Sequence, residues 1–182
     1  NRAAGATSSC RSGRGPQRHS AQRCRGLIYA RHVGACIAPD NAWLFLQGIE
    51  TLPLRMERHV ANARKIVEFL TKHPGVESVS YPELPEHPDY ALAKRLLPRG
   101  CGAVFSFNIK GDRAAGRRFV ESLKLFSHLA NVGDARSLVI HPASTTHFRV
   151  ATDMLEASGI KEGTMRLSVG LEDPVDLIDD LT

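Results

Sequence analysis

Two segments late in the chain carry the residues best suited to bind a small anionic ligand. They are Arg136-Ser-Leu-Val-Ile-His-Pro-Ala-Ser-Thr-Thr-His147 and Met165-Arg-Leu-Ser-Val-Gly-Leu-Glu172. If the second segment is a strand, its alternation sends Met165 and Leu167 to the core and turns Arg166 the other way. A guanidinium held on a strand presents a fixed fork of donors that can bind a carboxylate through two hydrogen bonds. Arg166 is therefore a candidate carboxylate site; the alternative is a surface arginine in a salt bridge.

The first segment surrounds two histidines with small hydroxyl residues and a proline. Such a segment can wrap a ligand with backbone and hydroxyl groups. It is a poor metal site, because His141 and His147 lack helical ligand spacing and no carboxylate lies near them. No nucleophile elbow, P-loop or dinucleotide glycine fingerprint occurs in the sequence. We therefore expect no metal ligands, and a structural role for the histidines.

The composition is that of a globular protein with one main domain. The chain has 182 residues, of which 42% are hydrophobic and 24% charged. Its four cysteines, Cys10, Cys24, Cys36 and Cys101, show no spacing typical of zinc or dithiol chemistry. No apolar run is long enough to span a bilayer, and no signal peptide is visible. These features predict a reduced protein with a cytoplasmic location and no membrane partner.

The net charge of +5 is concentrated at the start of the chain. Residues 1–33 contain seven Arg, no Lys and no acidic residue, which leaves 17 basic against 19 acidic residues in the rest. The body of the protein thus gives no electrostatic reason to expect nucleic acid as a partner. We expect residues 1–33 to be a disordered tail and residues 34–182 to be the folded domain.

Three explanations for this tail compete. It could be an RNA-binding arm, an organelle transit peptide, or sequence translated in the wrong frame. The abrupt change of composition near Gly34 and the absence of an initiator Met favour the third.

The remaining pattern predicts alternating helices and strands. Apolar residues recur at helical spacing from Leu44 to Leu70, which predicts one long N-terminal helix with a kink at Pro53. Strands are predicted over 76–81, 103–109, 127–131, 137–140 and 165–169, and helices over 90–97, 112–123, 152–157 and from Asp173 to the end. This order predicts a small α+β fold, with helices packed on a mostly antiparallel sheet.

Three motifs carry a resemblance to a known family. They are Gln47-Gly-Ile-Glu-Thr-Leu-Pro-Leu-Arg-Met-Glu-Arg-His59, the block from Leu125 to His147, and Arg166-Leu-Ser-Val-Gly-Leu-Glu172. From about residue 38 onward the chain resembles the C-terminal part of the Cys/Met-metabolism pyridoxal-phosphate (PLP) enzymes, in particular their O-acetylhomoserine sulfhydrylase (O-acetylhomoserine aminocarboxypropyltransferase) branch. Residues 1–33 resemble nothing in that family.

The resemblance implies the small C-terminal domain of a fold-type I PLP-dependent transferase, in an enzyme that is usually a homotetramer. It implies that Arg166 binds the α-carboxylate of O-acetyl-L-homoserine and that Ser137 lies beside it as a second substrate-binding residue. The whole enzyme would act in transsulfuration and methionine biosynthesis, converting this substrate and sulfide or a thiol to homocysteine or methionine and acetate.

Other activities remain open. A cystathionine synthase or lyase, or a methionine γ-lyase, would share the same arginine and serine. In a different class, the chain could be a non-catalytic binding module with an Arg-rich arm that contacts RNA.

The chain also departs from the family pattern. The lysine that anchors PLP, the aromatic residue that stacks on it and the phosphate-binding loop belong to the family's N-terminal domain. Lys72 follows a threonine, as the anchoring lysine often does, but it lies at the end of the predicted long helix. We therefore expect the PLP anchor to be absent from this chain and the chain to be inactive alone, which leaves open whether it is an enzyme by itself.

Overall fold

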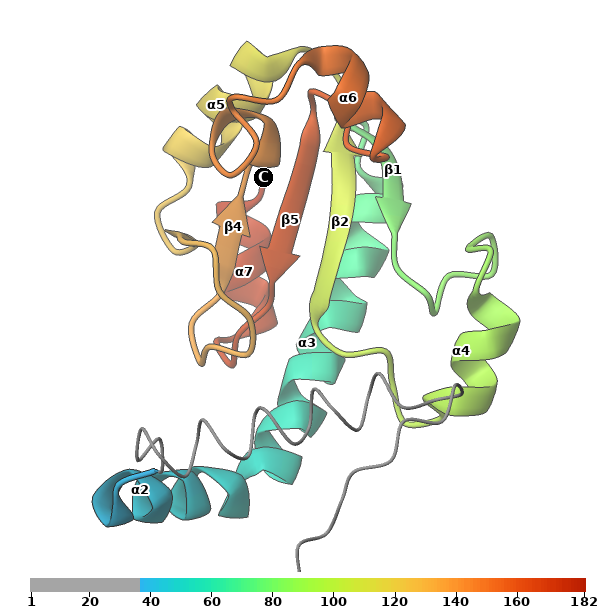
Figure 1. The fold of residues 1–182 in the computed structure, drawn as a ribbon. Helices are drawn as coiled ribbons and strands as arrows, with labels where there is room; N and C mark the ends of the chain where they lie inside the picture. Colours follow the sequence, from blue (N-terminus) through green and yellow to red (C-terminus); the bar gives the residue numbers. More distant parts are fainter. Residues whose placement is uncertain (1–36) are drawn as a thin grey trace, which may run out of the picture. The chain divides into compact units, whose positions relative to one another are not determined.

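The computed structural model describes residues 37–182, and the chain divides into two compact units, Asn1–Gly48 and Ile49–Thr182. Figure 1 shows the second unit as a twisted sheet with helices against it. The predicted tail, residues 1–33, lies outside the described residues, so the predicted boundary between residues 33 and 34 stays a prediction. No helix in the described part of the chain is long and apolar enough to cross a membrane.

Two helices occupy the stretch in which the sequence predicts one kinked helix. Helix α2 spans Pro39–Glu50 and helix α3 spans Leu52–Lys72, and they are separated at Thr51. A proline has no N–H, and its ring would clash with the carbonyl group four residues earlier, but it is tolerated in the first turn of a helix. The chain therefore restarts helix α3 with Pro53 in its first turn. The prediction of a single helix is wrong here, and the long helix that packs on the sheet is α3, with 21 residues.

The sheet of the second unit has five strands in the order β1-β2-β5-β4-β3. Their bounds are Val76–Ser80 (β1), Val104–Ile109 (β2), Ser127–His128 (β3), Leu138–Ile140 (β4) and Thr164–Ser168 (β5). Neighbouring strands are antiparallel except β3 and β4, which pair in parallel. The mostly antiparallel sheet predicted from the sequence is therefore confirmed.

Strand β3 is shorter than the predicted strand over residues 127–131. It ends at His128, and the chain then crosses toward β5, where the side chain of Arg166 donates a hydrogen bond to the carbonyl oxygen of Asn131. The backbone of this segment is thus bound by a side chain instead of a strand ladder.

The remaining helices are short, and two of them, α5 and α7, begin after an aspartate that caps the first turn. They are α4 (Tyr90–Leu96), α5 (Arg113–Ser122), the 3-10 helix η1 (Pro142–Ser144), α6 (Thr152–Ala157) and α7 (Pro174–Asp180). The Asp112 side chain accepts a hydrogen bond from the N–H of Ala115, and Asp173 accepts one from the N–H of Val175. Each carboxylate satisfies an N–H group that has no partner within its helix.

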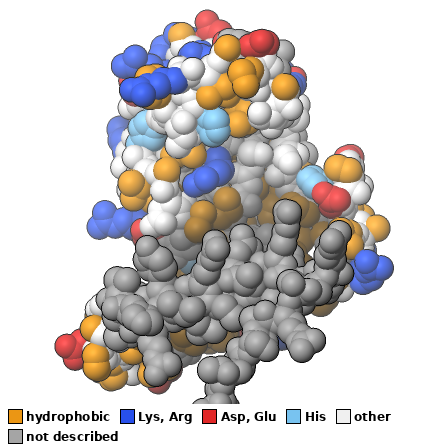
Figure 2. All heavy atoms as spheres, viewed as in Figure 1, with side chains coloured by type: hydrophobic (Ala, Val, Ile, Leu, Met, Phe, Trp, Pro, Cys, Tyr) orange, Lys and Arg blue, Asp and Glu red, His pale blue; other side chains and the backbone are white. Residues whose placement is uncertain are grey.

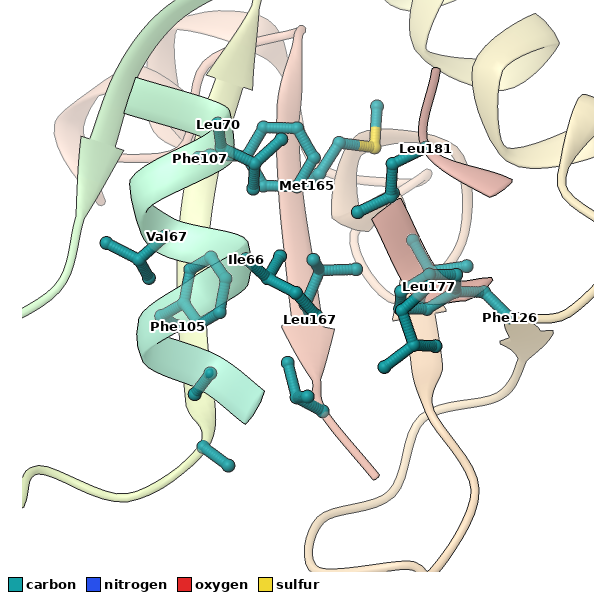
Figure 3. Close-up of a cluster of buried hydrophobic side chains, with 14 of the residues drawn as sticks. Ile66, Val67, Leu70, Phe105, Phe107, Phe126, Met165, Leu167, Leu177 and Leu181 are labelled. Carbon is teal, nitrogen blue, oxygen red and sulfur yellow. The ribbon is translucent and has the colours of Figure 1, made fainter. Parts of the chain in front are cut away.

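One face of the sheet forms the hydrophobic core against α3 and α7. Figure 3 shows Ile66, Val67 and Leu70 of α3 directed toward the side chains of β2 and β5. Met165 and Leu167 of β5 are fully buried there, as their alternation predicts. Burial of large apolar side chains stabilises a fold by roughly 1.5–3 kcal/mol each, so this core anchors β5 against the helices on one face of the sheet. The opposite face of β5 carries Arg166.

Candidate functional site

Arg166 lies on strand β5, between β2 and β4 in the sheet. It pairs with Ser106 of β2 on one side and with Ile140 of β4 on the other. Because its neighbours in sequence, Met165 and Leu167, are both fully buried in the core, its side chain is directed to the open face of the sheet. Figure 2 shows a basic side chain over β5 on this face. The sequence prediction that Arg166 lies on an anchored strand is confirmed.

The guanidinium of Arg166 has a single hydrogen-bond partner in the described part of the chain. Its Nη2 donates to the carbonyl oxygen of Asn131 at 3.1 Å. Among residues 37–182 whose side chains are described, no carboxylate forms a salt bridge with it. An arginine offers five N–H donors in one plane. Most of this fork is therefore available to an acceptor that approaches from the open face, which is what carboxylate recognition requires.

Ser137 lies just before β4 and is fully buried. Its hydroxyl donates to Oε2 of Glu172 at 2.9 Å and accepts from the backbone N–H of Gly170 at 2.8 Å. Its own backbone N–H donates to Oε1 of Glu172 at 2.7 Å. Ser137 thus joins the start of β4 to the turn that follows β5.

Helix α3 holds the same turn from its other side. The side-chain amide of Asn62 donates to the carbonyl oxygens of Gly170 and Glu172, at 3.0 and 2.8 Å. Nδ1 of the buried His59 donates to the carbonyl oxygen of Val169 at 2.6 Å. Buried carbonyl groups need such donors, because an unpaired one costs free energy. We call Ser137, Glu172, Asn62 and His59 the turn network.

Gly170 leaves room for this network. A Cβ atom at this position would collide with the carbonyl oxygen of Ala135 and with the carboxylate of Glu172. The absence of a side chain lets the two backbone segments approach closely. The turn network therefore depends on glycine at this point of the chain.

The structure brings Ser137 and Arg166 to the same two strands, but it does not place them in contact. Leu138 pairs with Ser168, so Ser137 lies near the end of β5, about three residues along from Arg166. At ~3.3 Å per residue this is about 10 Å along the strand. Substrate binding by Ser137 stays a prediction; what the structure shows is that its hydroxyl is engaged within the protein.

The two histidines in the segment from Arg136 to His147 have different surroundings. His141 is fully buried; its Nε2 donates to the carbonyl oxygen of Glu162 at 2.6 Å, and its Nδ1 is 2.8 Å from the hydroxyl of Ser144. Both ring nitrogens therefore have protein partners, which is a structural role. His147 is partly exposed and lies 2.8 Å from the hydroxyl of Thr146.

The sequence reasoning missed four contributors, which are Glu172, Asn62, His59 and Asn131. The turn network joins positions that are 33 to 110 residues apart in the chain, and Arg166 reaches Asn131 across 35 residues. The pattern of neighbouring residues in the sequence does not predict hydrogen-bond partners this far apart. Gly170 was the one local signal, because a glycine directly after a strand often marks a close backbone approach.

The lysines do not fit the role of a PLP anchor. All six, at positions 65, 72, 94, 110, 124 and 161, are exposed. Lys72 forms a salt bridge with Glu68 at 2.7 Å, and Lys161 forms one with Glu77 at 2.6 Å. A lysine that forms a Schiff base is activated by desolvation or a neighbouring cation, and these exposed ammonium groups lack that setting. No chemical step through PLP is therefore assigned to residues of this chain.

A cavity of about 520 Å³ lies away from Arg166, between α3 and α4. Its lining includes Arg64, Glu83, Lys94 and Cys101. The Glu83 carboxylate accepts hydrogen bonds from Arg64, from the Tyr81 hydroxyl and from the N–H of Cys101. Burial raises the pKa of Tyr81 far above its usual value, and Glu83 reinforces the shift. These groups satisfy one another, so this cavity does not compete with Arg166 as the candidate site.

The mostly antiparallel sheet and the helices packed on it form a partial domain of a fold-type I PLP-dependent enzyme. The family of Cys/Met metabolism PLP-dependent enzymes matches residues 15–182. The chain is 51% identical over 160 residues to the O-acetyl-L-homoserine sulfhydrylase of Leptospira meyeri, covering 87% of this chain and 36% of that protein. It is 46% identical over 149 residues to the L-methionine gamma-lyase of Treponema denticola, covering 82% of this chain and 37% of that protein.

A solved structure gives the same result. An O-acetylhomoserine (thiol)-lyase of Campylobacter jejuni, whose crystal structure carries N'-pyridoxyl-lysine-5'-monophosphate, matches with a TM-score of 0.78 and 44% identity, over 85% of this chain and 37% of that one. The chain belongs to the Cys/Met metabolism PLP-dependent enzyme family, as its motifs predicted. It spans about a third of the length of the curated relatives it matches.

The match also corrects one expectation from the sequence. It begins at residue 15, inside the segment that was expected to resemble nothing in the family. The Leptospira meyeri relative likewise aligns over 160 residues, more than residues 34–182 contain. Residues 1–33 stand apart in the sequence because of their composition. Their seven arginines, of which Arg31 is the last, make this segment unlike the rest of the chain.

Proposed function

We propose that this chain forms the substrate-carboxylate-binding part of an O-acetylhomoserine sulfhydrylase, in which Arg166 binds the α-carboxylate of O-acetyl-L-homoserine. The observation that carries the proposal is the guanidinium of Arg166, which is fixed on a core-anchored strand and has one backbone carbonyl as its partner among the described residues. A carboxylate offers two oxygen acceptors in one plane, which match the remaining N–H donors of the guanidinium.

The turn network supports this role of Arg166 indirectly. It ties the end of β5 to β4 through Ser137 and to α3 through Asn62. A binding side chain gains precision when the element that carries it is held by packing and by further hydrogen bonds. In our proposal Ser137 belongs to the substrate site and contributes to it by fixing β5.

The reaction of the whole enzyme is part of the proposal. It converts O-acetyl-L-homoserine and sulfide to homocysteine and acetate, or the same substrate and a thiol such as methanethiol to methionine and acetate. The names of the Leptospira meyeri and Corynebacterium glutamicum relatives, at 51% and 46% identity, favour this substrate. Assembly as a homotetramer and a cytoplasmic location complete the proposed picture.

A second candidate function is methionine γ-lyase. L-methionine gamma-lyases of Treponema denticola and Fusobacterium nucleatum are 46% identical to the chain. Both activities need the same carboxylate contact, so Arg166 serves either one. The difference between them is the group that leaves the substrate, which an activity assay resolves.

A chimaeric enzyme tests the proposal. Residues 37–182 would replace the matching segment of the Leptospira meyeri sulfhydrylase, and kcat and KM would be measured with O-acetyl-L-homoserine and sulfide. Arg166→Lys keeps the charge but loses the bidentate fork. Loss of one hydrogen bond between charged groups is worth about 1.5–3 kcal/mol, so kcat/KM should fall by about 10- to 150-fold. The matched control is Arg118→Lys on α5, whose side chain is exposed.

The proposal predicts an active chimaera whose loss of kcat/KM is confined to the Arg166 variant. An active chimaera in which Arg166→Lys and Arg118→Lys behave alike would refute the role of Arg166. Activity with L-methionine and none with O-acetyl-L-homoserine would favour the lyase.

We propose further that the chain has no activity alone, because its lysines do not fit the PLP anchor. The full chain would be mixed with one equivalent of PLP, reduced with borohydride and digested for mass spectrometry. We expect only scattered, substoichiometric labelling over the six exposed lysines. One lysine modified close to stoichiometrically would overturn this proposal.

A further inference from the structure

The open face of β5 carries a second polar side chain close to Arg166. Ser168 lies two residues further along the strand, so the alternation of the strand directs both side chains to the same face. Ser168 is nevertheless only 2% exposed. The backbone N–H of Gly133 donates a hydrogen bond to its hydroxyl at 3.4 Å. Residues 131–135, which we call the covering segment, therefore lie against this end of β5.

The covering segment follows β5 and the residues after it in the same chain direction. At its start, the carbonyl oxygen of Asn131 accepts the hydrogen bond from Arg166 at 3.1 Å. At its end, the carbonyl oxygen of Ala135 accepts one from the N–H of Leu171 at 2.8 Å. The hydroxyl of Ser168 holds the segment between these two points. The carbonyl group that orients the guanidinium thus belongs to a segment that Ser168 anchors.

Gly133 has a backbone conformation that favours glycine. Its φ of +72° lies in the left-handed region, which most other residues enter only with strain. A Cβ atom at this position would meet no atom of the described residues within 4 Å. The requirement for glycine therefore comes from the backbone and not from a lack of space. The N–H group that reaches Ser168 depends on this conformation.

We propose that Ser168 is a positioning residue for Arg166. It fixes the covering segment, so that the Asn131 carbonyl group holds the guanidinium in the direction that a substrate carboxylate needs. The inference rests on the proposed function of Arg166. Ser168 acts through the segment, because its hydroxyl is buried and already accepts the Gly133 N–H. A guanidinium binds a carboxylate through two parallel hydrogen bonds only when its fork is aligned with the two oxygens.

The other hydrogen bonds of the covering segment do not replace this one. The side chains of Asn131 and Asp134 accept hydrogen bonds from backbone N–H groups one and two residues further along the chain. Such local bonds stiffen the segment without attaching it to the sheet. The bond from Leu171 attaches the far end, four residues from Asn131. Apart from Arg166 itself, Ser168 is the attachment to β5 nearest to Asn131 among the hydrogen bonds of the described residues.

The test is NMR of the full chain labelled with 15N-arginine, in which Arg166→Lys identifies the Nε–H resonance of Arg166. Without ligand, the heteronuclear NOE of this resonance measures how firmly the guanidinium is held. We expect Ser168→Ala to lower that NOE toward the value of Arg118, whose side chain is exposed. On titration with O-acetyl-L-homoserine, the affinity should fall about 2- to 10-fold, the value of one neutral hydrogen bond.

Three further variants separate positioning from folding. Ser168→Thr keeps the hydroxyl on a residue that suits a strand, and should retain both the NOE and the affinity. Gly133→Ala strains the covering segment and should lower both; combined with Ser168→Ala it should add little, because the two changes act on one contact. The matched control is Ser78→Ala, whose hydroxyl accepts a hydrogen bond from Asn108 at 2.9 Å between β1 and β2. Its loss should leave the Arg166 resonance unchanged.

Urea unfolding of each variant completes the test. An unchanged Arg166 NOE in Ser168→Ala, even with a lower free energy of unfolding, would overturn the proposal, since that is the result of a purely structural serine. Equal effects of Ser168→Ala and Ser78→Ala would overturn it too. So would a Ser168→Thr variant that is as stable as the unmodified chain yet behaves like the alanine variant.

The two arms of the experiment keep this proposal apart from the proposed function. If O-acetyl-L-homoserine does not shift the Arg166 resonance of the unmodified chain, the proposed function fails. The NOE without ligand then still decides whether Ser168 holds the guanidinium through the covering segment.

Discussion

The buried hydroxyl of Ser137 offers a sharp test of the turn network, through Ser137→Ala. Alanine removes the hydrogen bond to Glu172 and leaves the N–H of Gly170 without its acceptor in a buried place. An unsatisfied buried donor costs about 1–3 kcal/mol, and the lost hydrogen bond to a carboxylate places the effect in the upper part of that range. We therefore expect the free energy of unfolding to fall by ~2–3 kcal/mol.

The assay is urea denaturation of the full chain, followed by far-ultraviolet circular dichroism. For a domain of this size each kcal/mol lowers Tm by about 2–4 °C, so thermal unfolding should shift by roughly 4–12 °C. The matched control is Ser122→Ala at the exposed end of α5, where the hydroxyl donates to the carbonyl oxygen of Phe119. That variant should change stability by less than about 0.5 kcal/mol. Equal effects of the two variants would refute the network argument.

Three other predictions concern the fold, each measured by urea unfolding. Gly170→Ala forces a Cβ into occupied space and should cost about 1–3 kcal/mol; an unchanged midpoint would show that the turn is loose. Leu167→Ala, at a fully buried site, should cost about 2–5 kcal/mol, and a loss below 1 kcal/mol would contradict the described core. Partial burial would raise the pKa of Asp180, but the N–H groups of residues 124–126 outweigh it and lower that pKa. The lowered pKa stabilises the fold at pH values above the unfolded pKa near 3.8, and this stability is lost as the pH falls through the folded pKa. Asp180→Asn should therefore make the free energy of unfolding less dependent on pH in the acid range. An unchanged dependence on pH would refute this.

Much of the fold follows from local signals in the sequence. Helix α6 has the predicted bounds 152–157, and α7 begins at Pro174 after its Asp173 cap, because caps and glycine stops act within a few residues. The break at Thr51 escaped prediction because the apolar spacing continues through it. Hydrophobic periodicity reports which faces are apolar, but it does not show whether the backbone hydrogen bonds are continuous.

The candidate site was predictable in one respect only. Strand alternation identified the direction of Arg166, since its two neighbours in sequence had to enter the core. The partners that hold this strand, Glu172 and Asn62, come from distant positions and follow from the topology of the sheet. Asn62 has no local feature that separates it from other polar residues of a helix.

The central claim is that Arg166 binds the substrate carboxylate, and its most direct test is the NMR signal of the Arg166 side chain. The full chain, labelled with 15N-arginine, would be titrated with O-acetyl-L-homoserine and with the analogue whose carboxylate is a carboxamide. Arg166→Lys assigns the Nε–H resonance. We predict that the carboxylate ligand shifts this resonance with an affinity at least about tenfold above that of the carboxamide, the value of one charged hydrogen bond. Equal shifts with both ligands, or a response at other arginines but not at Arg166, would contradict it.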